Sequence, residues 1–153
     1  MSDQPSYVYV TYIESTPETV WDALTDADLT AAYWGHSNVS DWEPGSRWEH
    51  LRTDGSQVAD VVGTVLVAER PTRLVTTWSA PGDEERPDRH SRVAFDIRPH
   101  GDIVRLTVTH EELNDEGELA DVSRGWPAVL SNLKSLIETG SPLPQDPWQV
   151  PGD

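Results

Sequence analysis

The feature that most constrains the fold is an unbroken succession of short β-strand patterns through the middle of the chain. Between about residues 38 and 111, β-branched and aromatic stretches alternate with short turn signals such as the Pro-His-Gly-Asp sequence at 99–102. Strands joined by turns this short pair in antiparallel fashion, because parallel neighbours need a crossover of a dozen or more residues. We therefore expect an antiparallel meander. The predicted strands are 7–13, 39–42, 46–52, 58–69, 73–79, 90–98 and 103–111.

Helical patterns precede and follow this meander. Ser15 and Glu18 form a capping-box pattern around Pro17, which predicts a short helix after the first strand. A second short helix is expected next, with Asp28 as its N-terminal cap and Gly35 at its end. The longest helix is predicted over 119–139. Its apolar residues follow helical spacing, at Trp126, Val129, Leu130, Leu133 and Ile137.

One position inside the long helical pattern is awkward. Pro127 would remove a backbone hydrogen bond and crowd the preceding turn, so we expect either a bend there or a helix that begins near Ser123. Gly140 is placed to end the helix. The tail at 141–153 holds four prolines and is expected to be extended. The chain thus divides into one domain at 1–140 and a proline-rich tail at 141–153.

These elements predict an α+β fold of the helix-grip kind. A curved antiparallel sheet would wrap around the long C-terminal helix, with two short helices after the first strand. An antiparallel sheet has one face to bury, and a single helix can cover it. A strongly curved sheet and one helix leave space between them, so we expect an internal pocket there.

Charge and composition exclude several classes of function. The chain has 11 Lys and Arg against 27 Asp and Glu, which gives a formal charge of −16. So acidic a protein is repelled by nucleic-acid phosphates and by anionic membrane surfaces, and we expect it to bind neither. There are no cysteines, no signal-peptide pattern and no apolar run of membrane-spanning length. The expectation is a cytoplasmic protein, either a monomer or a homodimer.

Several blocks of the sequence, in this order and spacing, resemble a known family. The blocks are 9–13, 15–26, 40–48, 63–65, 70–74, 77–78, 106–110, 125–127 and 130–140. They resemble the SRPBCC (START/Bet v-type) superfamily and, more narrowly, its branch named after activators of heat-shock-protein ATPase. The resemblance implies the helix-grip fold with an internal cavity.

The resemblance leaves the function open among three hypotheses. The superfamily includes lipid and hormone binders and polyketide aromatase/cyclases. The leading hypothesis is binding of a small hydrophobic or aromatic ligand in the cavity, as in sequestration of a natural product or self-resistance to an antibiotic. The first alternative is a polyketide cyclase/aromatase-type enzyme that uses a cavity histidine. The second is a co-chaperone-like module that modulates an ATPase through its outer surface.

Tryptophan supplies most of the candidate pocket residues. The chain has seven Trp and one Phe, and indoles give large apolar walls with one N–H donor each. The alternative is a core that simply uses Trp in place of Phe. The predicted ligand-binding residues are Trp34, Trp48, His50, Trp78, Phe95, Leu106, Val108, His110, Trp126 and Leu130.

Two histidines are the candidates for chemistry under the enzyme hypothesis. Strand alternation places His50 on the face of Trp48, and His110 on the face of Leu106 and Val108. Either could move a proton in the cavity, although each could equally be a hydrogen-bonded core histidine. The histidines lack metal-ligand spacing and no glycine-rich phosphate loop is present, so neither a metal nor a cofactor is expected.

Overall fold

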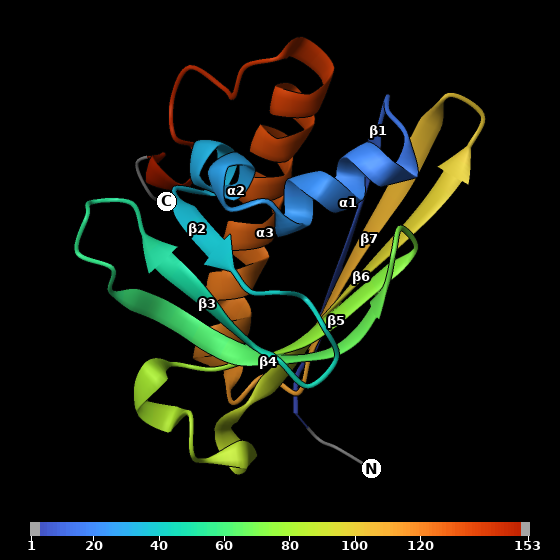
Figure 1. Cartoon of the computed structure of the whole chain (residues 1–153). Coiled ribbons are helices and arrows are strands. Elements are labelled where there is room, and N and C mark those ends of the chain that lie inside the picture. The colour runs from blue at the N-terminus through green and yellow to red at the C-terminus, as the bar shows by residue number, and fades with distance from the viewer. Residues whose placement is uncertain (1–3, 151–153) are drawn as a thin grey trace.

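The computed structural model describes residues 4–150 and is built on one curved antiparallel sheet (Figure 1). Seven strands are hydrogen-bonded in the order β1-β7-β6-β5-β4-β3-β2, so every neighbouring pair except β1 and β7 is consecutive in sequence. This confirms the predicted meander. The strands are β1 (Tyr7–Ile13), β2 (His36–Val39), β3 (Arg47–Arg52), β4 (Ala59–Glu69), β5 (Arg73–Trp78), β6 (Ser91–His100) and β7 (Ile103–Glu111).

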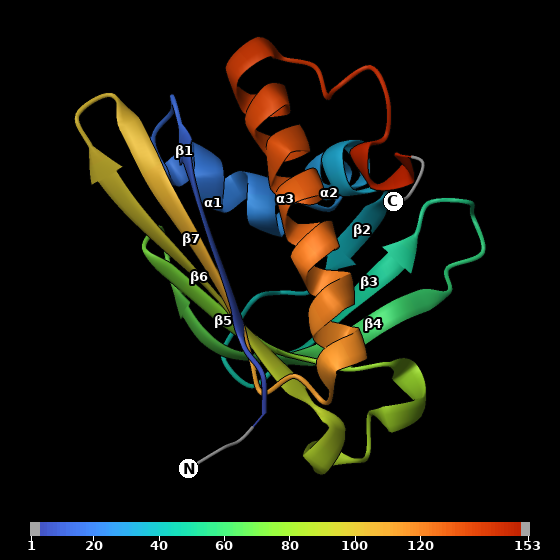
Figure 2. The same ribbon diagram turned by 180° about the vertical axis from the view of Figure 1, so that it is seen from behind.

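The sheet wraps around α3 (Glu116–Thr139), with α1 (Pro17–Thr25) and α2 (Ala27–Trp34) placed beside it. Figure 2 shows α3 lying across the concave side of the sheet and the two short helices crossing one end. Three short 3-10 helices complete the elements. These are η1 (Pro81–Asp83), η2 (Pro87–Arg89) and η3 (Pro147–Gln149). The arrangement confirms the α+β helix-grip fold, including the two short helices after the first strand.

The helix starts differ from those expected. Because Pro17 occupies the first helical position of α1, the residue before it is the cap, and Thr16 rather than Ser15 accepts from the Thr19 N–H. The cap of α2 is Asp26, not Asp28, and its carboxylate accepts two backbone N–H groups.

The long helix is more extensive than expected. α3 begins at Glu116, three residues before the predicted start, and the carboxylate of its cap, Asp115, accepts from the Glu118 N–H at 2.8 Å. The helix continues through Pro127 rather than beginning near Ser123. Packing of its apolar face against the sheet outweighs one missing hydrogen bond, because tertiary contacts supply most of a helix's stability. Gly140 ends the helix in a left-handed conformation, as predicted.

The first strand of the meander also lies elsewhere than predicted. β2 covers 36–39 in place of 39–42. Trp42 cannot continue a strand because its backbone is left-handed, with φ of 59°, and its indole N–H donates to the Thr25 carbonyl.

The tail beyond Gly140 is not simply extended. It folds back beside α2 and α3, where the Leu143 N–H donates to the Asn132 side chain at 2.6 Å (Figure 2). Trp148, in the turn η3, lies against Gly35 at the end of α2. Residues 151–153 of the predicted tail lie outside the described residues. Because Leu143 and Trp148 contact α3 and the end of α2, the predicted boundary at residue 140 separates segments that touch each other.

Candidate functional site

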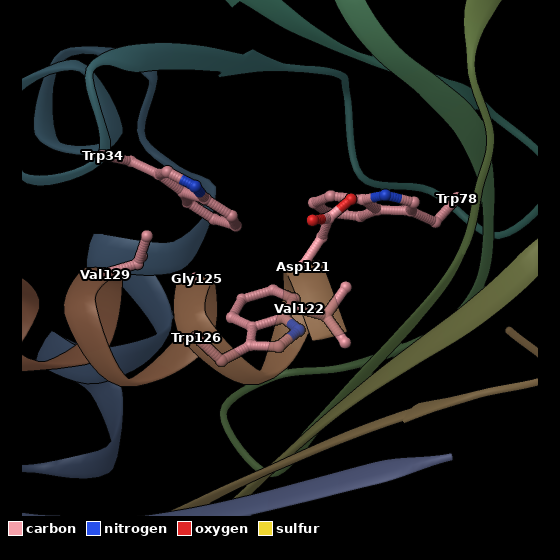
Figure 3. Close-up of a pocket in the computed structure, with 7 residues that line it drawn as sticks. All are labelled: Trp34, Trp78, Asp121, Val122, Gly125, Trp126 and Val129. Carbon is pink, nitrogen blue, oxygen red and sulfur yellow. The ribbon is translucent and has the colours of Figure 1, made fainter. Parts of the chain in front are cut away.

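The candidate site is an apolar pocket between α3 and the sheet, which we call the indole pocket. Three indoles from different elements form its walls: Trp34 ends α2, Trp78 ends β5, and Trp126 lies within α3. The pocket has a volume of about 190 Å³. Figure 3 shows the three rings turned toward a common space. The complete lining is Trp34, Trp78, Asp121, Val122, Gly125, Trp126 and Val129.

The α3 side of the pocket explains why four of its seven lining residues were not predicted. Asp121, Gly125 and Val129 follow one another at four-residue spacing along α3, and Val122 lies four residues before Trp126 on the neighbouring row. A glycine and an exposed aspartate resemble surface positions in a sequence, so apolar periodicity does not single them out. The available signal was the four-residue spacing that links Asp121 and Gly125 to the apolar Val129.

The deeper space between sheet and helix is almost closed. A second hollow beside the first has a volume of only about 10 Å³, close to that of one water molecule. Trp48 and Trp78 fill this region, with ring centroids 5.5 Å apart. Of the predicted residues, Trp48 and Phe95 line the second hollow alone, and Trp34 and Trp78 line both hollows. Its lining is Leu24, Trp34, Asn38, Trp42, Trp48, Leu74, Thr76, Trp78 and Phe95.

The other predicted residues line neither hollow. Leu106 and Val108 on β7 and Leu130 on α3 are fully buried within the hydrophobic core. Their strand and helix periodicity correctly indicated the inward face. Close packing of that face gives them core contacts in place of a cavity wall.

His110 is buried, and both of its ring nitrogens take part in a series of hydrogen bonds. An indole N–H can only donate, so the Trp126 N–H fixes Nδ1 of His110 as the acceptor, at 3.2 Å. The proton on Nε2 then goes to Ser91 Oγ at 2.8 Å, and the Ser91 hydroxyl donates to the Trp78 carbonyl. Burial lowers the pKa of His110 to about 4. The ring is therefore neutral at pH 7 and both its nitrogens are occupied.

His50 belongs to a separate polar cluster on β2, β3 and β4. Its Nδ1 lies 2.5 Å from Oδ1 of Asn38, which makes Nδ1 the donor. The His36 ring stacks on His50 at 4.1 Å, and Nε2 of His36 pairs with Asp60, which also binds Arg52. Burial, with a smaller contribution from His36, lowers the pKa of His50 to about 3. His50 is thus also neutral at pH 7.

The connection between His50 and the indole pocket is indirect. His50 packs against Trp34 edge to face at 4.9 Å and lies 5.9 Å from the centroid of Trp78. It therefore supports two of the pocket walls from behind and is not itself part of the lining.

Neither a metal cluster nor a membrane-spanning helix is found in the described part of the chain. No group of three or more His, Cys, Asp or Glu side chains within residues 4–150 could hold a metal ion. None of the helices described there is long and apolar enough to cross a membrane.

A helix-grip domain with a small aromatic pocket is the class that this geometry defines. The chain belongs to the family described as Activator of Hsp90 ATPase homolog 1-like protein, whose model matches residues 14–138. This confirms the resemblance found in the sequence. No curated protein matches the chain.

Solved structures of similar fold include proteins of different kinds. CalU16 from Micromonospora echinospora is 26% identical with a TM-score of 0.72, over 92% of this chain and 78% of that one. PFC0360w, an HSP90 activator from Plasmodium falciparum, is 20% identical with a TM-score of 0.71, over 86% and 95%. DynU16, from the dynemicin biosynthetic locus, is 21% identical with a TM-score of 0.75, over 92% of this chain and 50% of that one. The last two similarities show the fold alone.

Proposed function

We propose that this protein binds a small hydrophobic or aromatic molecule in the indole pocket without transforming it. The observation that carries the proposal is an apolar hollow of about 190 Å³ walled by Trp34, Trp78 and Trp126. Ligand sites are concave and mostly apolar with a few polar groups, so a hollow walled by three indoles, with one carboxylate at its rim, is a candidate binding site.

The volume indicates the size of the ligand. A dry apolar cavity of about 150 Å³ takes up benzene, whereas sites for drug-sized ligands occupy about 300–1,000 Å³. At about 190 Å³, the indole pocket suits one or two rings. A larger molecule such as a polyketide would insert one end and leave the rest outside, past the exposed rim at Asp121.

The state of the two histidines favours binding over catalysis. A general acid or base works best with a pKa near the operating pH and within reach of the substrate. His110 has a pKa of about 4 and both nitrogens hydrogen-bonded, and His50 has a pKa of about 3 and lies behind the pocket wall. The cyclase alternative therefore lacks a suitable proton carrier at these two positions.

Sequestration is the role that binding without chemistry best supports. DynU16 comes from a biosynthetic locus and PFC0360w is an HSP90 activator, so the fold itself does not choose between the hypotheses. The choice rests on the pocket. Holding a hydrophobic natural product out of solution requires an apolar cavity and no reactive group, and self-resistance would follow from the same property.

Gly125 offers a direct test because it lines the pocket and a Cβ added there would meet no atom within 4 Å. Gly125→Leu should fill the pocket without disturbing the core. Gly125→Ala is the matched control, since it adds the same helix propensity, up to about 1 kcal/mol, and little volume. The probes are 1-naphthol and p-cresol, followed by Trp fluorescence and by the shift in melting temperature.

The wild-type chain and Gly125→Ala should bind a probe and melt at a higher temperature in its presence, and Gly125→Leu should lose both effects. A wild-type chain that binds neither probe at millimolar concentration would overturn the proposal. So would a Gly125→Leu chain that binds as tightly as Gly125→Ala.

A further inference from the structure

We propose that the ligand of the indole pocket carries a positive charge, as a methylated or otherwise alkylated ammonium group. The inference rests on the proposed function and specifies the chemistry of the ligand. Its basis is the combination, at one small pocket, of three indoles and a carboxylate. An aromatic ring attracts a cation to its face through its quadrupole, and tryptophan does so most strongly.

The three indoles line the pocket at different angles. Trp34 and Trp78 lie 6.2 Å apart with ring planes at 24°, and Trp126 meets them at 61° and 54° from centroid distances of 5.3 and 5.7 Å. Rings at such angles present π-electron density from more than one direction. A compact ammonium group in the hollow that the three rings line can therefore lie within about 6 Å of more than one ring centroid, which is the range of the cation–π interaction.

Asp121 supplies the counter-charge at the rim. It lines the pocket from α3, and Figure 3 shows its carboxylate directed to the side that holds Trp34 and Trp78. The only ion pair that it makes in the described structure is with Arg124, 2.8 Å away on the same helix. Both side chains are about three-quarters exposed, so this pair contributes little and a bound cation can compete with it.

The rest of the molecule favours the same sign of charge. The formal charge of −16 attracts cations to the surface and raises the rate at which they reach an exposed rim. The remaining lining residues are Val122, Gly125 and Val129, which carry no charge. An anionic ligand would therefore meet Asp121 and three electron-rich ring faces with only Arg124 to balance them.

A pair of ligands of equal shape separates charge from size. Choline and 3,3-dimethylbutan-1-ol differ in one atom, the quaternary nitrogen that is replaced by carbon, so only choline is a cation. Titration of Trp fluorescence measures the dissociation constant of each. We expect choline to bind at least about tenfold more tightly, and its advantage to shrink as salt screens Asp121.

Two variants and a control test whether the selectivity for a cation comes from Asp121 at the rim. Asp121→Asn should weaken choline binding by about two- to fivefold and so reduce its advantage over the neutral alcohol, whereas Arg124→Gln should strengthen choline binding. Asp102→Asn is the control, because it removes the same charge from the exposed turn between β6 and β7.

The outcomes distinguish this inference from the function on which it rests. If the alcohol binds as tightly as choline, the pocket binds small molecules but the ligand is not selected by charge, and the inference is overturned. If Asp121→Asn and Asp102→Asn weaken choline equally, the selectivity is a general surface effect and the rim assignment is wrong. If neither choline nor the alcohol binds while Gly125→Ala still takes up 1-naphthol, the inference fails and the proposed function stands.

Discussion

A histidine can be placed in a hydrophobic core when each ring nitrogen has a partner, and His110 meets this condition through Trp126 and Ser91. This series of hydrogen bonds ends at the Trp78 carbonyl, so it joins Trp126 to Trp78, and both of these residues also form walls of the indole pocket. Strand alternation correctly placed His110 on the inward face. The partners could not be predicted, because Ser91 and Trp126 come from β6 and α3 and meet His110 only in the folded chain.

This arrangement predicts a loss of stability in mild acid. His110 has a pKa of about 4 when folded and about 6.5 when unfolded. Its contribution to the free energy of unfolding is therefore complete above pH 6.5. It falls by about 1.4 kcal/mol per pH unit as the pH drops toward 4, because only the unfolded chain takes up the proton. Below pH 4 it stays constant.

Urea unfolding at pH 7, 6 and 5 measures this effect, with His110→Gln as the comparison. The variant should lose less stability over this range than the wild-type chain. The slope that remains in the variant should come from His50, whose pKa of about 3 gives the same sign. Protonation of carboxylates relieves their mutual repulsion equally in the two proteins, so it cancels in the comparison. Equal slopes in the two would show that His110 is not held neutral in the folded state.

At the scale of the strands, Gly63 shows how the sheet closes over its own tryptophans. Gly63 lies opposite Trp48 in the β3–β4 ladder, and the Trp48 indole passes it to donate to the Thr77 carbonyl at 2.9 Å. A Cβ on Gly63 would overlap both the Thr77 carbonyl and the Trp48 nitrogen. Only glycine permits the strand and the indole to approach this closely.

Gly63→Ala should therefore destabilise the fold by at least about 1–3 kcal/mol, as expected when an atom is forced into a packed region. The overlap involves backbone, which cannot move aside as a flexible side chain could. Gly82→Ala is the control, because a Cβ there meets no atom within 4 Å. Urea unfolding compares the two variants, and equal stabilities would contradict the close approach at Gly63.

At the scale of the whole molecule, the sequence was sufficient for the architecture and insufficient for the pocket. The strand and helix periods and the short turns predicted a first strand and a meander of about six strands around a C-terminal helix, because each depends on residues close in the chain. The errors lie at Thr16, Asp26, Trp42 and Asp115, where a cap or a backbone conformation is chosen by a few local hydrogen bonds.

The pocket depends instead on how side chains from distant elements fill a shared space. Trp34, Trp78 and Trp126 were predicted as walls and line the indole pocket, whereas Leu106 and Val108 were predicted on the same grounds and are packed in the core. All five are apolar residues of inward faces. Whether such a residue meets another side chain or an empty volume is decided by tertiary packing, which periodicity does not contain.

The tail gives the last prediction, because it tests whether residues 1–140 form a domain by themselves. Asn132 on α3 is buried, and it joins the tail to α2 by accepting from the Leu143 N–H and donating to the Tyr33 carbonyl. A chain ending at Gly140 should keep the fold, since the sheet and α3 are complete. It should lose about 1–3 kcal/mol, because the Asn132 oxygen exchanges its bond to the Leu143 N–H for water and Trp148 no longer packs at the end of α2.

Circular dichroism and urea unfolding of the shortened chain make this measurement. The double variant Pro142→Ala and Pro144→Ala of the full-length chain is a milder comparison, because it keeps Leu143 and its N–H. We expect it to unfold close to the wild-type chain. A shortened chain that shows no cooperative unfolding would make the tail an integral part of the domain, and the boundary at residue 140 would be wrong. A shortened chain as stable as the full one would mean that the Asn132 contact contributes nothing measurable.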